Sequence, residues 1–208
     1  MPGPTRVEAA SLLLSLAPPP WGMRHARAVA ETAAWLARAV DARTGCDRRS
    51  VEAAGLLHDA DKALPRGDPV RRLPHGEGSA AWLAAHGLAD LGPLVANHPA
   101  PRLLADAFGR WLVDASIEAA IVAYADKRAA QRLEPMAVRF AGWARRHGDD
   151  GWPRDARDVA WRRARELEDR VCAAADCRPE DVERLAWTAR ALHVAAEARV
   201  AGAAGLAP

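Results

Sequence analysis

The chain has 208 residues, half of them apolar, and a net charge of +2 with acidic and basic residues mixed along its length. This length suits one domain with a sizeable core, and the apolar fraction excludes a disordered chain. The weak net charge gives no electrostatic reason to expect nucleic acid or an acidic membrane as a partner. No apolar run approaches the roughly 20 residues that are needed to span a bilayer.

Good helix formers dominate the sequence, no segment alternates like a half-buried strand, and clusters of β-branched residues are missing. The sequence therefore predicts an all-α fold. Apolar spacing and helix breakers place the helices, in chain order, at about residues 5–16, 21–43, 48–60, 75–86, a short helix that carries residue 98 near its end, 114–131, 135–146, 155–175 and 179–200.

The clearest break in the chain is Gly148-Asp-Asp-Gly-Trp-Pro153, which we expect to be a hinge. It separates a helical core of residues 1–147 from a helical extension of residues 154–200. We expect the extension to form a C-terminal helical hairpin that packs on the core or on a second subunit, so a homodimer is one expected arrangement. Residues 201–208 are expected to be a disordered tail.

The most informative feature is the dipeptide His58-Asp59, which follows an apolar helical run. An imidazole and a carboxylate side by side at a helix end can both bind one divalent cation. Further candidate ligands lie at predicted helix faces or ends on both sides of this dipeptide: His25, His75, His98 and Asp126. His86 and His147 each precede a glycine and are instead predicted to cap helices, and His193 is predicted to be a surface or packing residue.

The order His, His-Asp, His, His, Asp resembles the HD superfamily of metal-dependent phosphohydrolases. The flanking residues are similar as well: Arg24-His25-Ala-Arg-Ala-Val-Ala, Leu56-Leu-His-Asp-Ala-Asp-Lys62, His75-Gly-Glu-Gly-Ser-Ala80 and Ala123-Tyr-Ala-Asp-Lys127. The resemblance covers roughly residues 20–147. It implies an HD-domain helical bundle and an enzyme that hydrolyses ester or anhydride bonds of phosphates.

The resemblance also implies the metal ligands. His25, His58, Asp59 and Asp126 would hold one ion, His75 and His98 would serve a second, and Asp59 or Asp126 would bridge the two. Imidazole and carboxylate ligands without thiolate suit iron, manganese, cobalt, zinc or magnesium. Two such cations roughly 4 Å apart stabilise the attacking and leaving oxygens of an in-line displacement. A phosphoester or phosphoanhydride of a small nucleotide-like compound is therefore the expected substrate.

Lysine usage adds a second indication of the site. Of the 29 lysine and arginine residues, only Lys62 and Lys127 are lysines, and each lies beside a proposed metal ligand. If the helix continues past His58, Lys62 points into the same cavity, where its compact charge can neutralise a phosphate or a leaving oxygen. Asp61 can orient Lys62 or carry a proton, or it can be a surface residue. The predicted catalytic residues are Asp59, Asp61 and Lys62.

Cations near the proposed ligands are candidates for binding substrate phosphates. Three arginines occupy the loop between the two central motifs, where they can make bidentate phosphate contacts or simply form a solvated loop. The full set of predicted substrate-binding residues is Arg24, Lys62, Arg66, Arg71, Arg72, Lys127 and Arg128.

Three classes of function remain open from the sequence. The first is hydrolysis of a nucleotide or dinucleotide, as in the bacterial symmetrical diadenosine tetraphosphate hydrolases that these motifs resemble. The second is hydrolysis of a cyclic nucleotide or another small phosphodiester on the same metals. The third is a non-catalytic metal-binding or nucleotide-binding sensor or scaffold. The three cysteines match no zinc or redox spacing and are expected to be free thiols in a reducing compartment, which favours the cytoplasm.

Overall fold

The computed structural model describes residues 3–204, with the side chains of residues 146–151 and 204 outside the description. This part of the chain contains no β-strand, and one isolated bridge joins Ala129 and Leu133. The predicted all-α fold is therefore confirmed. None of the helices within residues 3–204 is long and apolar enough to cross a membrane.

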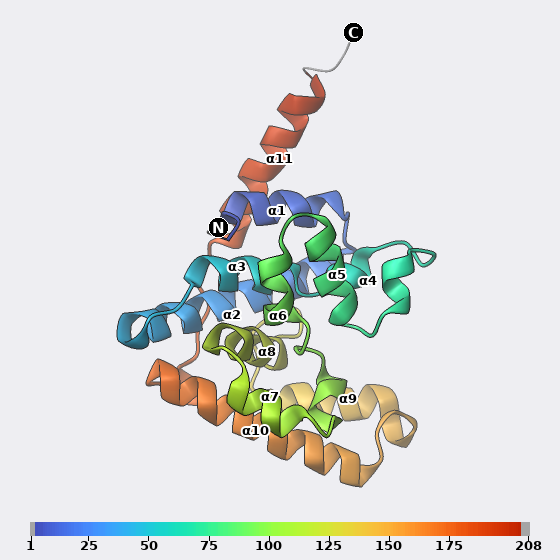
Figure 1. Cartoon of the computed structure of the whole chain (residues 1–208), viewed down its shortest axis with the longest axis vertical. Helices are drawn as coiled ribbons and strands as arrows, with labels where there is room; N and C mark the ends of the chain where they lie inside the picture. The colour runs from blue at the N-terminus through green and yellow to red at the C-terminus, as the bar shows by residue number, and fades with distance from the viewer. Residues whose placement is uncertain (1–2, 205–208) are drawn as a thin grey trace.

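The order of the helices along the chain is shown in Figure 1. The first six are α1 (Arg6–Ser15), α2 (Pro20–Thr44), α3 (Arg48–Leu57), α4 (Ala60–Ala63), α5 (Glu77–Ala85) and α6 (Gly92–Val95). The next five are α7 (Phe108–Asp114), α8 (Ile117–Arg128), α9 (Met136–Gly151), α10 (Arg154–Ala175) and α11 (Thr188–Ala204). Short 3-10 turns lie between them: η1 (Pro69–Arg72), η2 (Ala89–Leu91), η3 (Ala100–Leu104) and η4 (Pro179–Asp181).

Helix α2 forms the centre of the core, and α3 and α8 pack along it. The close approach of α3 depends on Gly55, where an added Cβ would lie 3.0 Å from the Cα of Ala30. Because glycine has no Cβ, the two helix backbones can come this close. Helix α2 carries His25 and α3 ends beside His58, so this contact also sets the distance between two proposed ligands.

The predicted helix over residues 48–60 is interrupted at its most informative point. Helix α3 ends at Leu57, and α4 begins only at Ala60. Between them Asp59 has φ −101° and ψ 23°, which is the sparsely populated region between helix and strand where active-site residues are often found. The break turns the Asp59 side chain toward the histidines that surround it.

The predicted hinge at residues 148–153 is shorter in the structure, since α9 continues to Gly151 and only Trp152 and Pro153 separate it from α10. Helix α10 packs against α2, α8 and η3. The division of the chain into a core and an extension stays a prediction.

The predicted helix over residues 179–200 begins only at Thr188 and continues to Ala204. The delay has a tertiary cause, because the backbone N–H of Leu185 donates to the Glu31 carbonyl at 3.2 Å. Arg184 and Thr188 bind the carboxylate of the same glutamate. These contacts on α2 hold the segment before α11 out of a helix.

The expected C-terminal hairpin is not formed in the described part of the chain. Helix α11 packs against α1, whereas α10 lies on the opposite side of the molecule against α8 and α2 (Figure 1). The predicted tail of residues 201–208 starts as helix, because α11 includes residues 201–204. Residues 205–208 lie outside the described residues.

Candidate metal centre

Three buried histidines present the same nitrogen, Nε2, to the carboxylate of Asp59. In each, the Nδ1 atom lies within hydrogen-bond distance of a backbone carbonyl, and a carbonyl can only accept, so Nδ1 carries the proton. The Nε2 atom of each ring is therefore the one with a free lone pair, as a metal ligand requires. The pairs are His25 with Ala130 (2.6 Å), His58 with Gly55 (2.9 Å) and His98 with Val95 (2.6 Å).

His75 is oriented by a carboxylate instead of a carbonyl. Its Nδ1 atom lies 2.8 Å from an oxygen of Asp61, and the hydroxyl of Ser79 donates to the other oxygen of Asp61 at 2.9 Å. Asp61 is buried, so the surface alternative for this residue is wrong. The contacts of Asp61 show that it orients His75, not Lys62. A carboxylate behind a ligating imidazole fixes the ring and raises its basicity.

The carboxylate of Asp59 lies between all four imidazoles. Its Oδ1 atom is 3.2 Å from His75 Nε2, 3.3 Å from His98 Nε2 and 3.6 Å from His58 Nε2. Its Oδ2 atom is 3.5 Å from His25 Nε2. In the described part of the chain, two groups have the geometry to hold an ion, and Asp59 belongs to both: His25, His58 and Asp59, and Asp59, His75 and His98.

Asp126 joins the first of these groups from α8. Its Oδ1 atom lies 3.2 Å from His25 Nε2 and 3.9 Å from His58 Nε2. The structure thus brings together all six residues that the sequence proposed as ligands, although they are spread over about 100 residues of the chain. The other histidines lie elsewhere. His86 follows α5 and bonds to the Trp82 carbonyl, His193 is exposed, and the side chain of His147 lies outside the described residues.

The arrangement of the nitrogen atoms fits a cation. The Nε2 atoms of His25 and His58 face each other at 3.1 Å, and so do those of His75 and His98. Because each Nδ1 carries a proton, two neutral rings in this arrangement bring two Nε2 lone pairs together, and these repel unless a positive charge, either a proton or a metal ion, lies between them. A divalent cation at each pair satisfies both lone pairs and the adjacent carboxylate, so this donor set fits one or two such ions.

The electrostatics differ among the proposed ligands. Burial acts to lower the pKa of His25 and of His75, but the carboxylates beside them outweigh it and raise both values. Burial lowers the pKa of His58 to about 3 and also lowers the pKa of His98, which keeps these two rings neutral. Burial acts to raise the pKa of Asp59, but the surrounding imidazoles and the Lys62 ammonium hold it well below its usual value. Burial also acts to raise the pKa of Asp126, but Lys127 and His25 outweigh it and hold this pKa well below its usual value. Neutral imidazoles and ionised carboxylates are the forms that bind metals.

Both lysines of the chain contact a ligand carboxylate. The Nζ atom of Lys62 lies 3.0 and 3.1 Å from the two oxygens of Asp59, and 43% of its side chain is exposed. The Nζ atom of Lys127 lies 2.8 Å from Asp126, and it also donates to the backbone carbonyl of His98. Lys127 is buried, so its predicted role in binding substrate is corrected: it positions Asp126 and His98.

The predicted substrate-binding arginines do not line the cavity beside this centre. Arg128 is buried and bonds to the Tyr124 hydroxyl and the Pro179 carbonyl, so it points away from the ligands and its prediction is also corrected. Successive helix residues point about 100° apart, which is why neighbours of Asp126 reach other surfaces. The remaining four are partly or fully exposed: Arg24 bonds to Gln131, Arg71 bonds to the Leu64 carbonyl, and Arg66 and Arg72 lie on the loop around η1.

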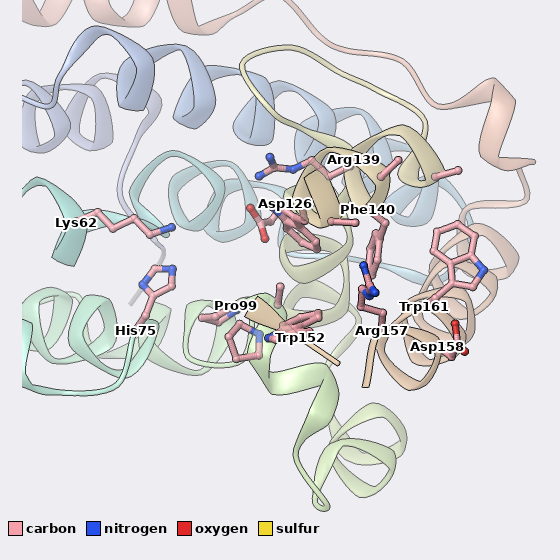
Figure 2. Close-up of a pocket in the computed structure, with 16 residues that line it drawn as sticks. Lys62, His75, Pro99, Asp126, Arg139, Phe140, Trp152, Arg157, Asp158 and Trp161 are labelled. Atoms are coloured by element: carbon pink, nitrogen blue, oxygen red, sulfur yellow. The ribbon is translucent and has the colours of Figure 1, made fainter. Parts of the chain in front are cut away.

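A cavity of about 610 Å³ opens beside the centre (Figure 2). Lys62, His75 and Asp126 line one end of it. The sequence reasoning missed its far wall, which α9, the start of α10 and the residues between them supply: Arg139, Phe140, Trp143, Trp152, Arg157, Asp158 and Trp161. The available signal was the concentration of aromatic residues between positions 140 and 161.

The fold and the site define a class of protein: a helical domain with a buried histidine–carboxylate centre that opens onto a cavity. The model of the HD domain matches residues 22–131, just over half of the chain and all six proposed ligands, and the chain belongs to this family. Membership in this family implies a metal-dependent phosphohydrolase, and the two histidine–carboxylate groups are consistent with binding of divalent metals. Comparison with curated proteins and with solved structures gave no match.

Proposed function

We propose that this protein hydrolyses a phosphoester or phosphoanhydride bond of a small nucleotide-like substrate. The observation that carries the proposal is the pair of ligand groups that share Asp59 beside a cavity of about 610 Å³. Cavities of this size suit small molecules, and the ligand types suit divalent cations. The cationic Lys62 at the cavity end nearest the ligands favours an anionic substrate.

Different residues of the chain would have different roles in such a reaction. His25, His58, Asp59 and Asp126 would hold one ion, and His75 and His98 with Asp59 would hold the other. Bound there, the ions supply Lewis acidity and a water molecule that is deprotonated near neutral pH. Asp61 and Lys127 keep the ligands in place from behind.

Of the two lysines beside the proposed ligands, Lys62 is the one that lines the cavity. Its ammonium group neutralises negative charge that develops on a phosphate or on a leaving oxygen. Asp59 and Lys62 therefore remain proposed catalytic residues. Asp61 is instead a positioning residue, because its carboxylate is occupied by His75 and Ser79.

The test begins with elemental analysis of the purified protein and continues with chromatographic analysis of the products formed from a panel of nucleotides, dinucleotides, cyclic nucleotides and simple phosphoesters. Asp59→Ala is expected to abolish turnover and reduce bound metal while the helical circular dichroism stays unchanged. The matched control is Asp106→Ala, which removes an exposed carboxylate that belongs to neither ligand group and does not line the cavity, and it should retain full activity.

The outcomes separate the three classes of function. Cleavage of nucleotides or dinucleotides supports the proposal, and ring opening of cyclic substrates alone supports the small phosphodiesterase. Bound metal without turnover on any substrate of the panel would contradict hydrolysis and favour the sensor or scaffold.

A further inference from the structure

The wall of the cavity opposite the proposed metal ligands is unusually aromatic. The whole chain has eight tryptophans and two phenylalanines. Three of these tryptophans and one phenylalanine line this single cavity: Trp143, Trp152, Trp161 and Phe140. Their rings contact one another, with centroids 4.8 Å apart for Phe140 and Trp143, 5.2 Å for Phe140 and Trp161, and 6.3 Å for Trp143 and Trp152.

The aromatic wall lies outside the part of the chain that defines the family. The HD domain match ends at residue 131, whereas the wall consists of residues from α9, from the start of α10 and from the short segment between them. Figure 2 shows Lys62 and His75 at one side of the cavity, Trp161 at the other, and Phe140 and Trp152 between them. The reactive end thus comes from the domain shared by the family and the aromatic end from a segment that follows it.

The polar residues of this wall indicate which class of ligand it binds. Arg139, Arg157 and Asp158 also line it, and the Arg139 guanidinium lies over the Trp143 ring, 5.0 Å from its centroid. An alkyl chain would be bound by apolar side chains without these charges. A flat ring with a polar edge uses both the ring faces and the charged groups, because aromatic side chains stack on the π-face of any nucleobase.

We infer that the wall formed by α9 and the start of α10 is a base-binding subsite, which selects phosphates that carry a nucleobase over the same phosphates without one. The inference rests on the proposed function, since it places the phosphate at the metal end. Trp152 is the clearest test residue. It lies in the two-residue connection between α9 and α10, outside both helices.

The experiment compares pairs of ligands that differ by the base: AMP with ribose 5-phosphate, and ADP with ribose 5-diphosphate. Dissociation constants are measured by calorimetry on the metal-loaded protein, and kcat/KM is measured by phosphate release. Trp152→Leu keeps an apolar side chain but removes the ring, and Trp152→Phe keeps a ring. Trp21→Leu is the matched control, because Trp21 is 48% exposed and does not line the cavity.

The wild-type protein should prefer the base-carrying member of each pair by about tenfold or more, the usual scale of one stacking contact. Trp152→Leu should lose most of this preference by weakening AMP and ADP alone, whereas Trp152→Phe and Trp21→Leu should retain it. Equal binding of AMP and ribose 5-phosphate by the wild type would overturn the inference, and so would an equal loss for both ligands in Trp152→Leu.

The two proposals fail in different ways. Preference for the base in calorimetry without any phosphate release would leave the subsite standing and remove the proposed hydrolysis. Phosphate release with no preference for the base would leave the hydrolysis standing and remove the subsite.

Discussion

Lys62 should be sensitive to the shape of its charged group as well as to its charge. Its ammonium group lies 3.0 and 3.1 Å from the two oxygens of Asp59 while also lining the cavity. Lys62→Met removes the charge. Lys62→Arg keeps the charge but replaces a compact point with a planar fork that binds both oxygens of a carboxylate at once. In that position the fork would compete with the ions for Asp59.

The size of the effect follows from the distance and the exposure of the side chain. Two unit charges about 4 Å apart interact by about 1 kcal/mol in water and about 4 kcal/mol at an effective dielectric constant of 20. The Lys62 side chain is 43% exposed, so an intermediate value of about 2 kcal/mol applies to its contact with a phosphate. This energy corresponds to a roughly thirtyfold lower kcat for Lys62→Met.

The assay measures kcat and KM for phosphate release together with the metal content of each variant. Lys62→Met should lower kcat with metal retained, and Lys62→Arg should also be impaired. Arg110→Met serves as the control, because it removes an exposed positive charge that does not line the cavity. Wild-type kinetics in Lys62→Met would refute the role of the charge. Wild-type kinetics in Lys62→Arg would refute the role of its shape.

Two further predictions concern the residues that hold the ligands. Asp61→Asn should weaken metal binding at His75 by roughly tenfold, because a neutral amide supports the imidazole less well than a carboxylate. Metal titration measures this, and an unchanged affinity would contradict the assigned role. Lys127→Met should lower the free energy of unfolding by about 3–5 kcal/mol, because it leaves the buried Asp126 carboxylate without its ammonium partner. Urea denaturation in a chelator provides the test, and a loss below about 1 kcal/mol would count against it.

The sequence predicted most of the helices because their ends carry local signals. The first helix, the second helix and α10 agree with prediction to within about one residue at each end, helped by prolines at 18–20 and by Gly45. The sequence also predicted the six proposed ligands that the structure brings together. Imidazoles and carboxylates in a fixed order identify such a set without any knowledge of distances.

The features that the sequence did not predict depend on tertiary contacts. Helix α7 was missed because it contains Gly109, a poor helix former. Its last turn is held by Arg170 of α10, which donates to the Leu112 carbonyl. The aromatic wall was missed because it exists only after the chain turns at Trp152 and places α10 beside α9. The residues at 148–153 predict a break in the chain, but no local pattern specifies the direction in which the chain turns there.

If each of the two groups that contain Asp59 holds an ion, the sharing of this carboxylate has a thermodynamic consequence. Binding of the first ion changes the binding free energy of the second, because the first ion fixes or withdraws this carboxylate. The second ion must change the binding free energy of the first by the same amount, because coupling between two binding events is reciprocal. A titration should therefore not resolve into two independent constants. Changes at His25 or at His98 should each shift the apparent affinity of the opposite position, although neither residue belongs to it.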